Sequence, residues 1–87
     1  MPEKFEINKE CVINELKNRA VIFEPSGREI YILEDEEYHI LKMFKSACSF
    51  EAVIKQLEID YNVTGIEQDV VSFVMQLVEK EILRGAR

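Results

Sequence analysis

The chain has 87 residues, a length that fits one domain and leaves little room for a large internal substrate pocket. Its net charge is −6, from 11 Lys and Arg against 17 Asp and Glu, and the basic residues are scattered singly. Nucleic-acid binding depends on clustered Lys and Arg, so DNA and RNA are disfavoured. The sequence also lacks a signal-peptide layout and an apolar run of ~18 residues, so we expect a cytoplasmic protein without membrane contact.

The first third of the sequence carries strand signals. Residues 11–16 partly alternate in polarity, and residues 19–24 are rich in β-forming side chains. Residues 25–28 combine a proline, which presets φ for a turn, with a glycine that accepts positive φ. The chain then returns along a strand at residues 29–33, so we predict a hairpin over residues 19–33.

The pattern next changes to helical periodicity, with three predicted helices. We expect Asp35 to cap the first and Ser49 to cap the second. Thr64 and Glu67 fit the capping box of a third helix that runs to about Leu83. The order predicts an α+β domain in which a three-stranded antiparallel sheet is followed by three helices that cover one of its faces.

The third helix carries more apolar surface than a core needs. At about 100° per residue, one line is the natural core stripe, formed by Ile66, Val70, Phe73 and Leu77. An adjacent line consists of Val71, Met75, Val78 and Ile82, with Val74 between the two lines. The combined arc is about twice the ~100° of a helix that packs by one face. We therefore expect the second line to be covered by something.

The strand at residues 29–33 shows the same surplus, because both of its faces are apolar or aromatic. At a sheet edge it would be unprotected, since no Pro or Lys interrupts it. Two interpretations follow from the pattern: burial in the core or in a homodimer, and a groove that adds an extended peptide as one more strand. The groove would lie between the edge of this strand and the second apolar line of the third helix.

The residues that could carry chemistry do not form a recognisable catalytic set. His39 has no nucleophile or metal-ligand partner nearby in the sequence, and we assign it a surface or capping role. Cys11 and Cys48 are far apart and sit in apolar patterns, as small buried side chains do. We expect no enzymatic activity, no metal and no cofactor.

The succession of motifs resembles the PqqD-like family, the recognition elements of ribosomally made and post-translationally modified peptides. The resemblance begins with the hairpin and with Tyr38-His39-Ile40-Leu41, and continues with Ser49-Phe50-Glu51-Ala52-Val53. Its last part is Asp69-Val70-Val71-Ser72-Phe73-Val74-Met75-Gln76-Leu77, similar to the family's D-V-x-x-F-[LV]-x-x-L pattern. It covers roughly residues 10–84, and Glu81 stands where many members have Gly.

The resemblance implies a winged-helix-like fold without catalysis. Family members hold the leader segment of a precursor peptide as an added strand between their third strand and third helix. In this sequence the resemblance maps that groove onto Glu29, Ile30, Tyr31, Ile32, Leu33, Val71, Val74, Met75 and Val78. They present it to a maturation enzyme, such as a radical SAM protein in quinone-cofactor biosynthesis of the pyrroloquinoline type, or a lasso-peptide protease and cyclase. The family-pattern residues Val70, Phe73 and Leu77 fall on the line that we assign to packing.

Two other functions remain open from the sequence. A winged-helix DNA-binding domain would need a basic recognition helix, whereas the third helix carries Glu67, Asp69, Glu79 and Glu81 against Lys80 and Arg84. A homodimeric structural module would hide the apolar surfaces against a second copy.

Overall fold

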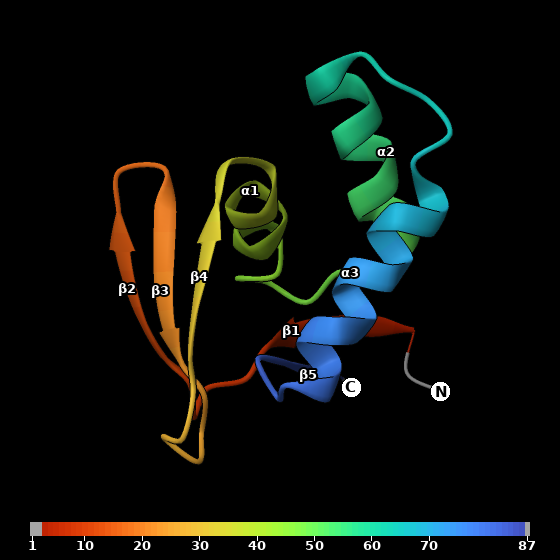
Figure 1. The fold of residues 1–87 in the computed structure, drawn as a ribbon. Helices are drawn as coiled ribbons and strands as arrows, with labels where there is room; N and C mark the ends of the chain where they lie inside the picture. Colours follow the sequence, from red (N-terminus) through yellow and green to blue (C-terminus); the bar gives the residue numbers. More distant parts are fainter. Residues whose placement is uncertain (1–2, 87) are drawn as a thin grey trace.

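Three consecutive strands form an antiparallel sheet in the computed structural model, which describes residues 3–86 (Figure 1). Strand β2 spans Val12–Leu16, β3 spans Arg19–Phe23 and β4 spans Ile30–Glu34, in the spatial order β2-β3-β4. The turns contain residues that tolerate positive φ, Asn18 at 66° and Gly27 at 72°. The predicted hairpin is confirmed, and β4 lies at an edge of the sheet.

Three helices follow the strands: α1 is Asp35–Met43, α2 is Phe50–Tyr61 and α3 is Glu67–Glu79. This order confirms the α+β class predicted from the sequence. The predicted cap of α2 is also confirmed, because the Ala52 amide donates a hydrogen bond to Ser49 Oγ at 3.2 Å.

The other two predicted caps are wrong. Asp35 is the first residue of α1, and the capping position belongs to Glu34, whose side chain makes no capping hydrogen bond. The capping position of α3 is Ile66, which has no side-chain acceptor, so the box of Thr64 and Glu67 does not form. The helix begins later than Thr64 would require, and its first acidic residues instead lie where the helix dipole favours them.

Helix α3 ends at Glu79 rather than near Leu83. The Ile82 amide donates to the Leu77 carbonyl at 2.9 Å and the Glu81 amide to the Val78 carbonyl at 3.0 Å, the two bonds of a Schellman motif. Glu81, with φ of 62°, occupies the left-handed position of that motif. The chain then turns back and forms a strand in place of another helical turn.

This last strand, β5, spans Leu83–Ala86 and pairs with β1, Lys4–Ile7, at the opposite end of the sequence. The predicted ordered core of residues 10–84 leaves β1 out. Phe5 of β1 is 3% exposed and also bridges to Cys48, with reciprocal backbone hydrogen bonds of 2.8 and 3.0 Å. Strands β1 and β5 therefore belong to the packed structure.

The core lies between the inner face of the sheet and the helices. The sheet contributes Ala20, Ile22 and Leu33, and the segments after it contribute residues that include Phe44, Leu41, Val53, Val74, Leu77 and Ile82. The outer face of the sheet is uncovered in this structure. Its exposed side chains are each more than half accessible to solvent: Val12, Leu16, Ile30 and Ile32.

The left-handed backbone at Glu81 predicts that Glu81→Gly stabilises the protein. A left-handed conformation costs a residue with a Cβ about 1–2 kcal/mol, and glycine avoids this cost while losing some chain entropy on folding. We expect the free energy of unfolding to rise by about 0.5–1 kcal/mol, measured by urea denaturation. Ser72→Gly, at an exposed position inside the helix, is the matched control and should destabilise. Equal effects of the two substitutions would contradict this account of the helix end.

Candidate functional site

The backbone of β4 has one side free of hydrogen bonds to another strand. Next to the β3–β4 ladder, the Glu24 amide donates to the Glu29 carbonyl and the Asp35 amide donates to the Asn18 carbonyl. In an antiparallel pair, hydrogen-bonded positions alternate along each strand. Positions 29, 31, 33 and 35 therefore face β3. The backbone groups that point to the free edge are those of Ile30, Ile32 and Glu34.

Side chains of β4 alternate in the same way. Leu33 is buried against the core and Tyr31 is half-buried on the same inner face, whereas Ile30 and Ile32 are 57% and 53% exposed on the outer face. Glu29 precedes the strand and accepts a hydrogen bond from the Tyr31 hydroxyl at 2.6 Å. Four of the five residues predicted from this segment thus lie in the edge strand, with Glu29 directly before it, and the outward backbone positions of the strand coincide with its exposed side chains.

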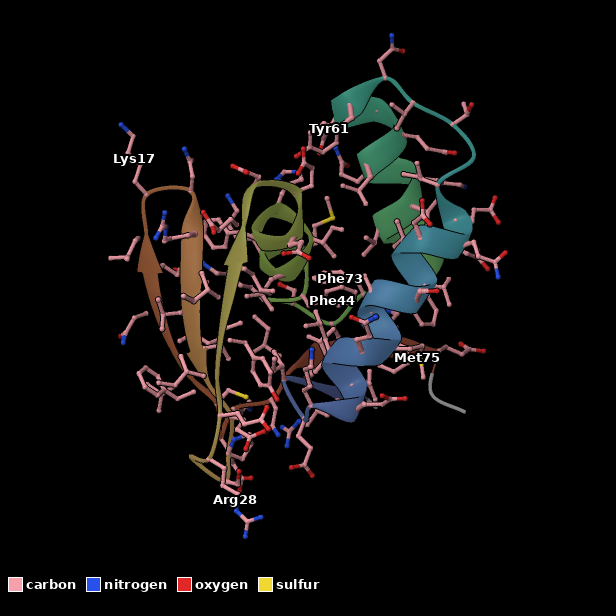
Figure 2. The ribbon with its side chains drawn as sticks, viewed as in Figure 1. Lys17, Arg28, Phe44, Tyr61, Phe73 and Met75 are labelled. Atoms are coloured by element: carbon pink, nitrogen blue, oxygen red, sulfur yellow. The ribbon has the colours of Figure 1, made fainter. Side chains whose placement is uncertain are left out.

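The end of α3 reaches the edge strand through one contact. The Lys80 Nζ lies 4.7 Å from the centre of the Tyr31 ring, in a cation–π arrangement. Phe73 lies about 20° from Lys80 around the helix, on the same flank. We call the set Phe73, Gln76 and Lys80 the Phe73 flank of α3. This flank faces β4 and α1, and Figure 2 shows Phe73 on that side of the helix.

The second apolar line of α3 is not on this flank, which corrects the predicted groove. Met75 is about 160° from Phe73 around the helix, and Figure 2 shows it on the side away from β4. Val71 and Val78 lie on the same side as Met75, and Val78 packs against the core. Val74 is 0% exposed, so its side chain is part of the core and not of a surface. The structure therefore separates these four residues from the β4 edge.

Sequence reasoning missed an apolar cleft between the three helices. It has a volume of 410 Å³ and opens beside the Phe73 flank. Phe73, which we assigned to packing, is only partly buried and forms one wall. The cleft is lined by apolar side chains from all three helices and the loop before α3, among them Ile40, Leu57, Tyr61, Val63, Ile66 and Phe73. Figure 2 shows Tyr61 and Phe73 on opposite sides of this space.

The polar part of the cleft lining is entirely acidic. Glu36 and Glu37 contribute from the first turn of α1, and Asp69 contributes from the first turn of α3. All three side chains are exposed. Carboxylates on a low-dielectric wall attract cations more strongly than carboxylates surrounded by water. The cleft thus combines an apolar interior with a negatively charged rim.

A polar cluster joins α1 to the end of α2 beside this cleft. His39 Nε2 lies 2.8 Å from Asp60 Oδ2, and Gln56 Nε2 donates to Asp60 Oδ1 at 2.8 Å. The hydrogen bonds from His39 and Gln56 lower the pKa of Asp60. The His39 ring also makes an edge contact with Tyr61, with 5.7 Å between ring centroids. His39 therefore has a surface role that positions Tyr61.

The two cysteines are free and half-buried, and burial raises the pKa of both thiols. Cys48 Sγ donates to the Met43 carbonyl at 3.3 Å and Cys11 Sγ to the Glu81 carbonyl at 3.4 Å. Within residues 3–86, His, Cys, Asp and Glu side chains do not gather in groups of three that could hold a metal ion. No helix in that part of the chain is long and apolar enough to cross a membrane.

The burial of Val74 predicts opposite outcomes for two neighbouring charge substitutions. Val74→Asp places an unpaired carboxylate in the core and should lower the free energy of unfolding by more than about 4 kcal/mol. Met75→Asp, at a half-exposed position, should lower the free energy of unfolding by about 1 kcal/mol or less. Thermal and urea unfolding followed by circular dichroism measure both. A folded Val74→Asp protein would show that α3 is rotated differently from the description above.

Tyr31 provides a test of the edge geometry. Its hydrogen bond to Glu29, together with partial burial, raises the pKa of Tyr31 to about 12. Glu29→Gln removes the charge that disfavours the phenolate, so the pKa of Tyr31 should fall toward the ordinary value of about 10. Titration of the tyrosine Cζ resonances by NMR measures it. Glu15→Gln, whose carboxylate contacts Tyr38, is the control that should leave Tyr31 unchanged. An unchanged Tyr31 titration in Glu29→Gln would contradict the contact.

Comparison of the chain with protein-family models, with curated proteins and with solved structures finds no match. The resemblance to the PqqD-like family therefore stays a prediction from the sequence.

Proposed function

We propose that this protein is a peptide-binding adaptor. It adds an extended segment of a precursor peptide as a strand on the free edge of β4 and presents that peptide to a separate maturation enzyme. The observation that carries the proposal is the run of outward backbone positions at Ile30, Ile32 and Glu34, on an edge without proline or lysine.

Strand addition alone would not give appreciable affinity. Each net hydrogen bond contributes about 0.5–1.5 kcal/mol. Ile30 and Ile32 each offer one donor and one acceptor, whereas Glu34 offers only its amide, because its carbonyl accepts the first hydrogen bond of α1. Fixing each residue of a flexible peptide costs about 1–2 kcal/mol of backbone entropy, which nearly cancels that gain. Net affinity therefore has to come from burial of peptide side chains. Phe73 and the outer-face side chains of Ile30 and Ile32 supply apolar surface on either side of the added strand.

The charge of the protein favours a basic or neutral peptide. The net charge is −6, and acidic residues run from the end of β4 into α1 at positions 34–37. Opposite charges speed the encounter of two molecules and disfavour wrong partners more than they raise affinity. The resemblance to the PqqD-like family supports the second half of the proposal, in which the partner is a radical SAM protein or a lasso-peptide protease and cyclase.

Self-association is a second candidate, favoured by the uncovered outer face of the sheet with exposed Val12, Leu16, Ile30 and Ile32. The rise per residue and the spacing between strands give the face of three five-residue strands a projected area of only about 240 Å². A stable interface buries about 800 Å² of accessible surface per partner. The face is small for a stable homodimer on its own, so strand addition remains the leading proposal. Sedimentation velocity at high protein concentration measures the association.

Ile32→Pro is the sharpest test of strand addition. It removes the central outward amide of β4 but no hydrogen bond to β3, since proline is tolerated at a free sheet edge. With a 12-residue peptide selected on the wild-type protein from a random display library as the probe, we expect at least ~10-fold weaker binding by calorimetry. Wild-type protein labelled with ¹⁵N should show peptide-induced shifts at residues 29–34.

Ile32→Val is the matched control, because it keeps the amide, the β-branched shape and most of the apolar surface, and should bind with nearly the wild-type affinity. Equal binding by the Ile32→Pro and wild-type proteins would refute strand addition. A DNA titration of the same labelled protein tests the winged-helix alternative, for which we expect no shifts.

A further inference from the structure

The β4 edge and the cleft between the helices lie one after the other on the protein surface. At one end of β4, Tyr31 contacts Lys80 near the end of α3. At the other end, β4 leads directly into α1, whose Glu36 lines the cleft together with Phe73. Lys80 and Phe73 are on the same flank of α3. A strand on the β4 edge would therefore run from the Tyr31–Lys80 contact toward the mouth of the cleft.

The direction of an added strand determines which part of a peptide reaches the cleft. The sheet is antiparallel throughout, and antiparallel pairing is the commoner mode. A peptide antiparallel to β4 has its paired residues beside Ile30, Ile32 and Glu34, and its preceding residues beside Glu36. The residues on the amino-terminal side of the paired strand are the ones that meet the cleft.

We propose that this cleft is the specificity pocket of the adaptor, and that it takes one large apolar or aromatic side chain flanked by Lys or Arg on the amino-terminal side of the added strand. The inference rests on the proposed function, because it assumes that a peptide is bound at β4. The 410 Å³ volume is at the lower end of the ~300–1,000 Å³ range of ligand pockets, so it fits a side chain better than a folded element.

Charge complementarity identifies the occupant. The rim carries the carboxylates of Glu36, Glu37 and Asp69, and no Lys or Arg lines the cleft in the part of the chain that the structure describes. An acidic peptide would be repelled at the rim, whereas a peptide that is apolar at its centre and basic on its flanks matches both parts. The His39–Asp60 pair and the His39–Tyr61 contact fix the wall opposite Phe73, so the pocket is largely formed before the peptide binds.

Selection from a display library of random 12-residue peptides tests the inference and does not require the natural peptide. The baits are the wild-type protein, a Glu37→Lys/Asp69→Lys variant, and a Glu51→Lys/Glu79→Lys control with the same change of charge at exposed sites outside the cleft. We expect wild-type and control baits to enrich peptides with a large apolar residue flanked by Lys or Arg. The cleft variant should bind those peptides at least ~10-fold more weakly.

The apolar half of the pocket has its own variant pair. Phe73→Ala removes one wall, and Val71→Ala truncates a side chain on the opposite flank of the same helix. The enriched peptides should lose affinity with Phe73→Ala and keep it with Val71→Ala, and circular dichroism establishes that both variants are folded. If Phe73→Ala is unfolded, the Glu37→Lys/Asp69→Lys variant alone tests the specificity pocket.

The outcomes separate this inference from the proposed function. Peptides that lose binding with Ile32→Pro but bind the cleft variant as well as the control would overturn the specificity pocket and leave strand addition standing. Peptides that depend on the cleft but bind Ile32→Pro unchanged would overturn strand addition alone. If no peptide is enriched on the wild-type bait, both are wrong.

Discussion

The antiparallel register between β3 and β4 is the constraint on which the rest of this structure depends. Ile22 pairs with Tyr31, and Ala20 pairs with Leu33. Residues of β4 that direct their backbone to β3 also direct their side chains into the core, because both properties alternate along a strand. A slip of one residue would bury Ile30 and Ile32 and would turn the Tyr31 amide toward the free edge. The same pairing therefore fixes the hydrophobic core and the set of backbone groups available to a partner.

Helix α3 is held in a similar way, by the burial of one side of its surface. Val70, Val74 and Leu77 are each at most 4% exposed, and this burial leaves a single rotation for the helix. That rotation turns Phe73 and Lys80 toward the sheet edge and Met75 away from it. Because Phe73 is only partly buried, it joins the core to the cleft. Substitution of Phe73 therefore changes the packing of the core and the lining of the cleft together.

The features that the sequence predicted correctly have local causes. The hairpin depends on Gly27 and on the β-forming residues around it, and the cap of α2 depends on Ser49 and the amide three residues later. The β1–β5 pair depends on contacts between opposite ends of the chain, which periodicity over a short window does not register. The end of α3 also escaped prediction, because Glu81 occupies a left-handed position without the glycine that usually marks it.

The structure separates the two halves of the predicted site. The residues of its strand half lie together at a sheet edge, as the pairing order shows, whereas those of α3 do not lie beside that edge. The two apolar lines of α3 differ little in sequence, so the pattern gave no means of choosing which of them faces the sheet. Val74, between the lines, turns out to define the core direction. The cleft is lined by residues of three helices that only tertiary packing brings together. Patterns over a short stretch of sequence therefore do not predict it.

The pairing of β1 with β5 has a consequence for how this domain can be used as a module. Lys4 is the register partner of Ala86, so the chain enters and leaves the domain at neighbouring points, as Figure 1 also shows. A domain with adjacent ends can be inserted into a surface loop of a larger protein without stretching the host chain. In such an insertion the junctions would lie on the two-stranded ribbon, and the edge of the separate β2-β3-β4 sheet would stay exposed. The fold is thus suited to insertion as a module into the surface of a larger protein.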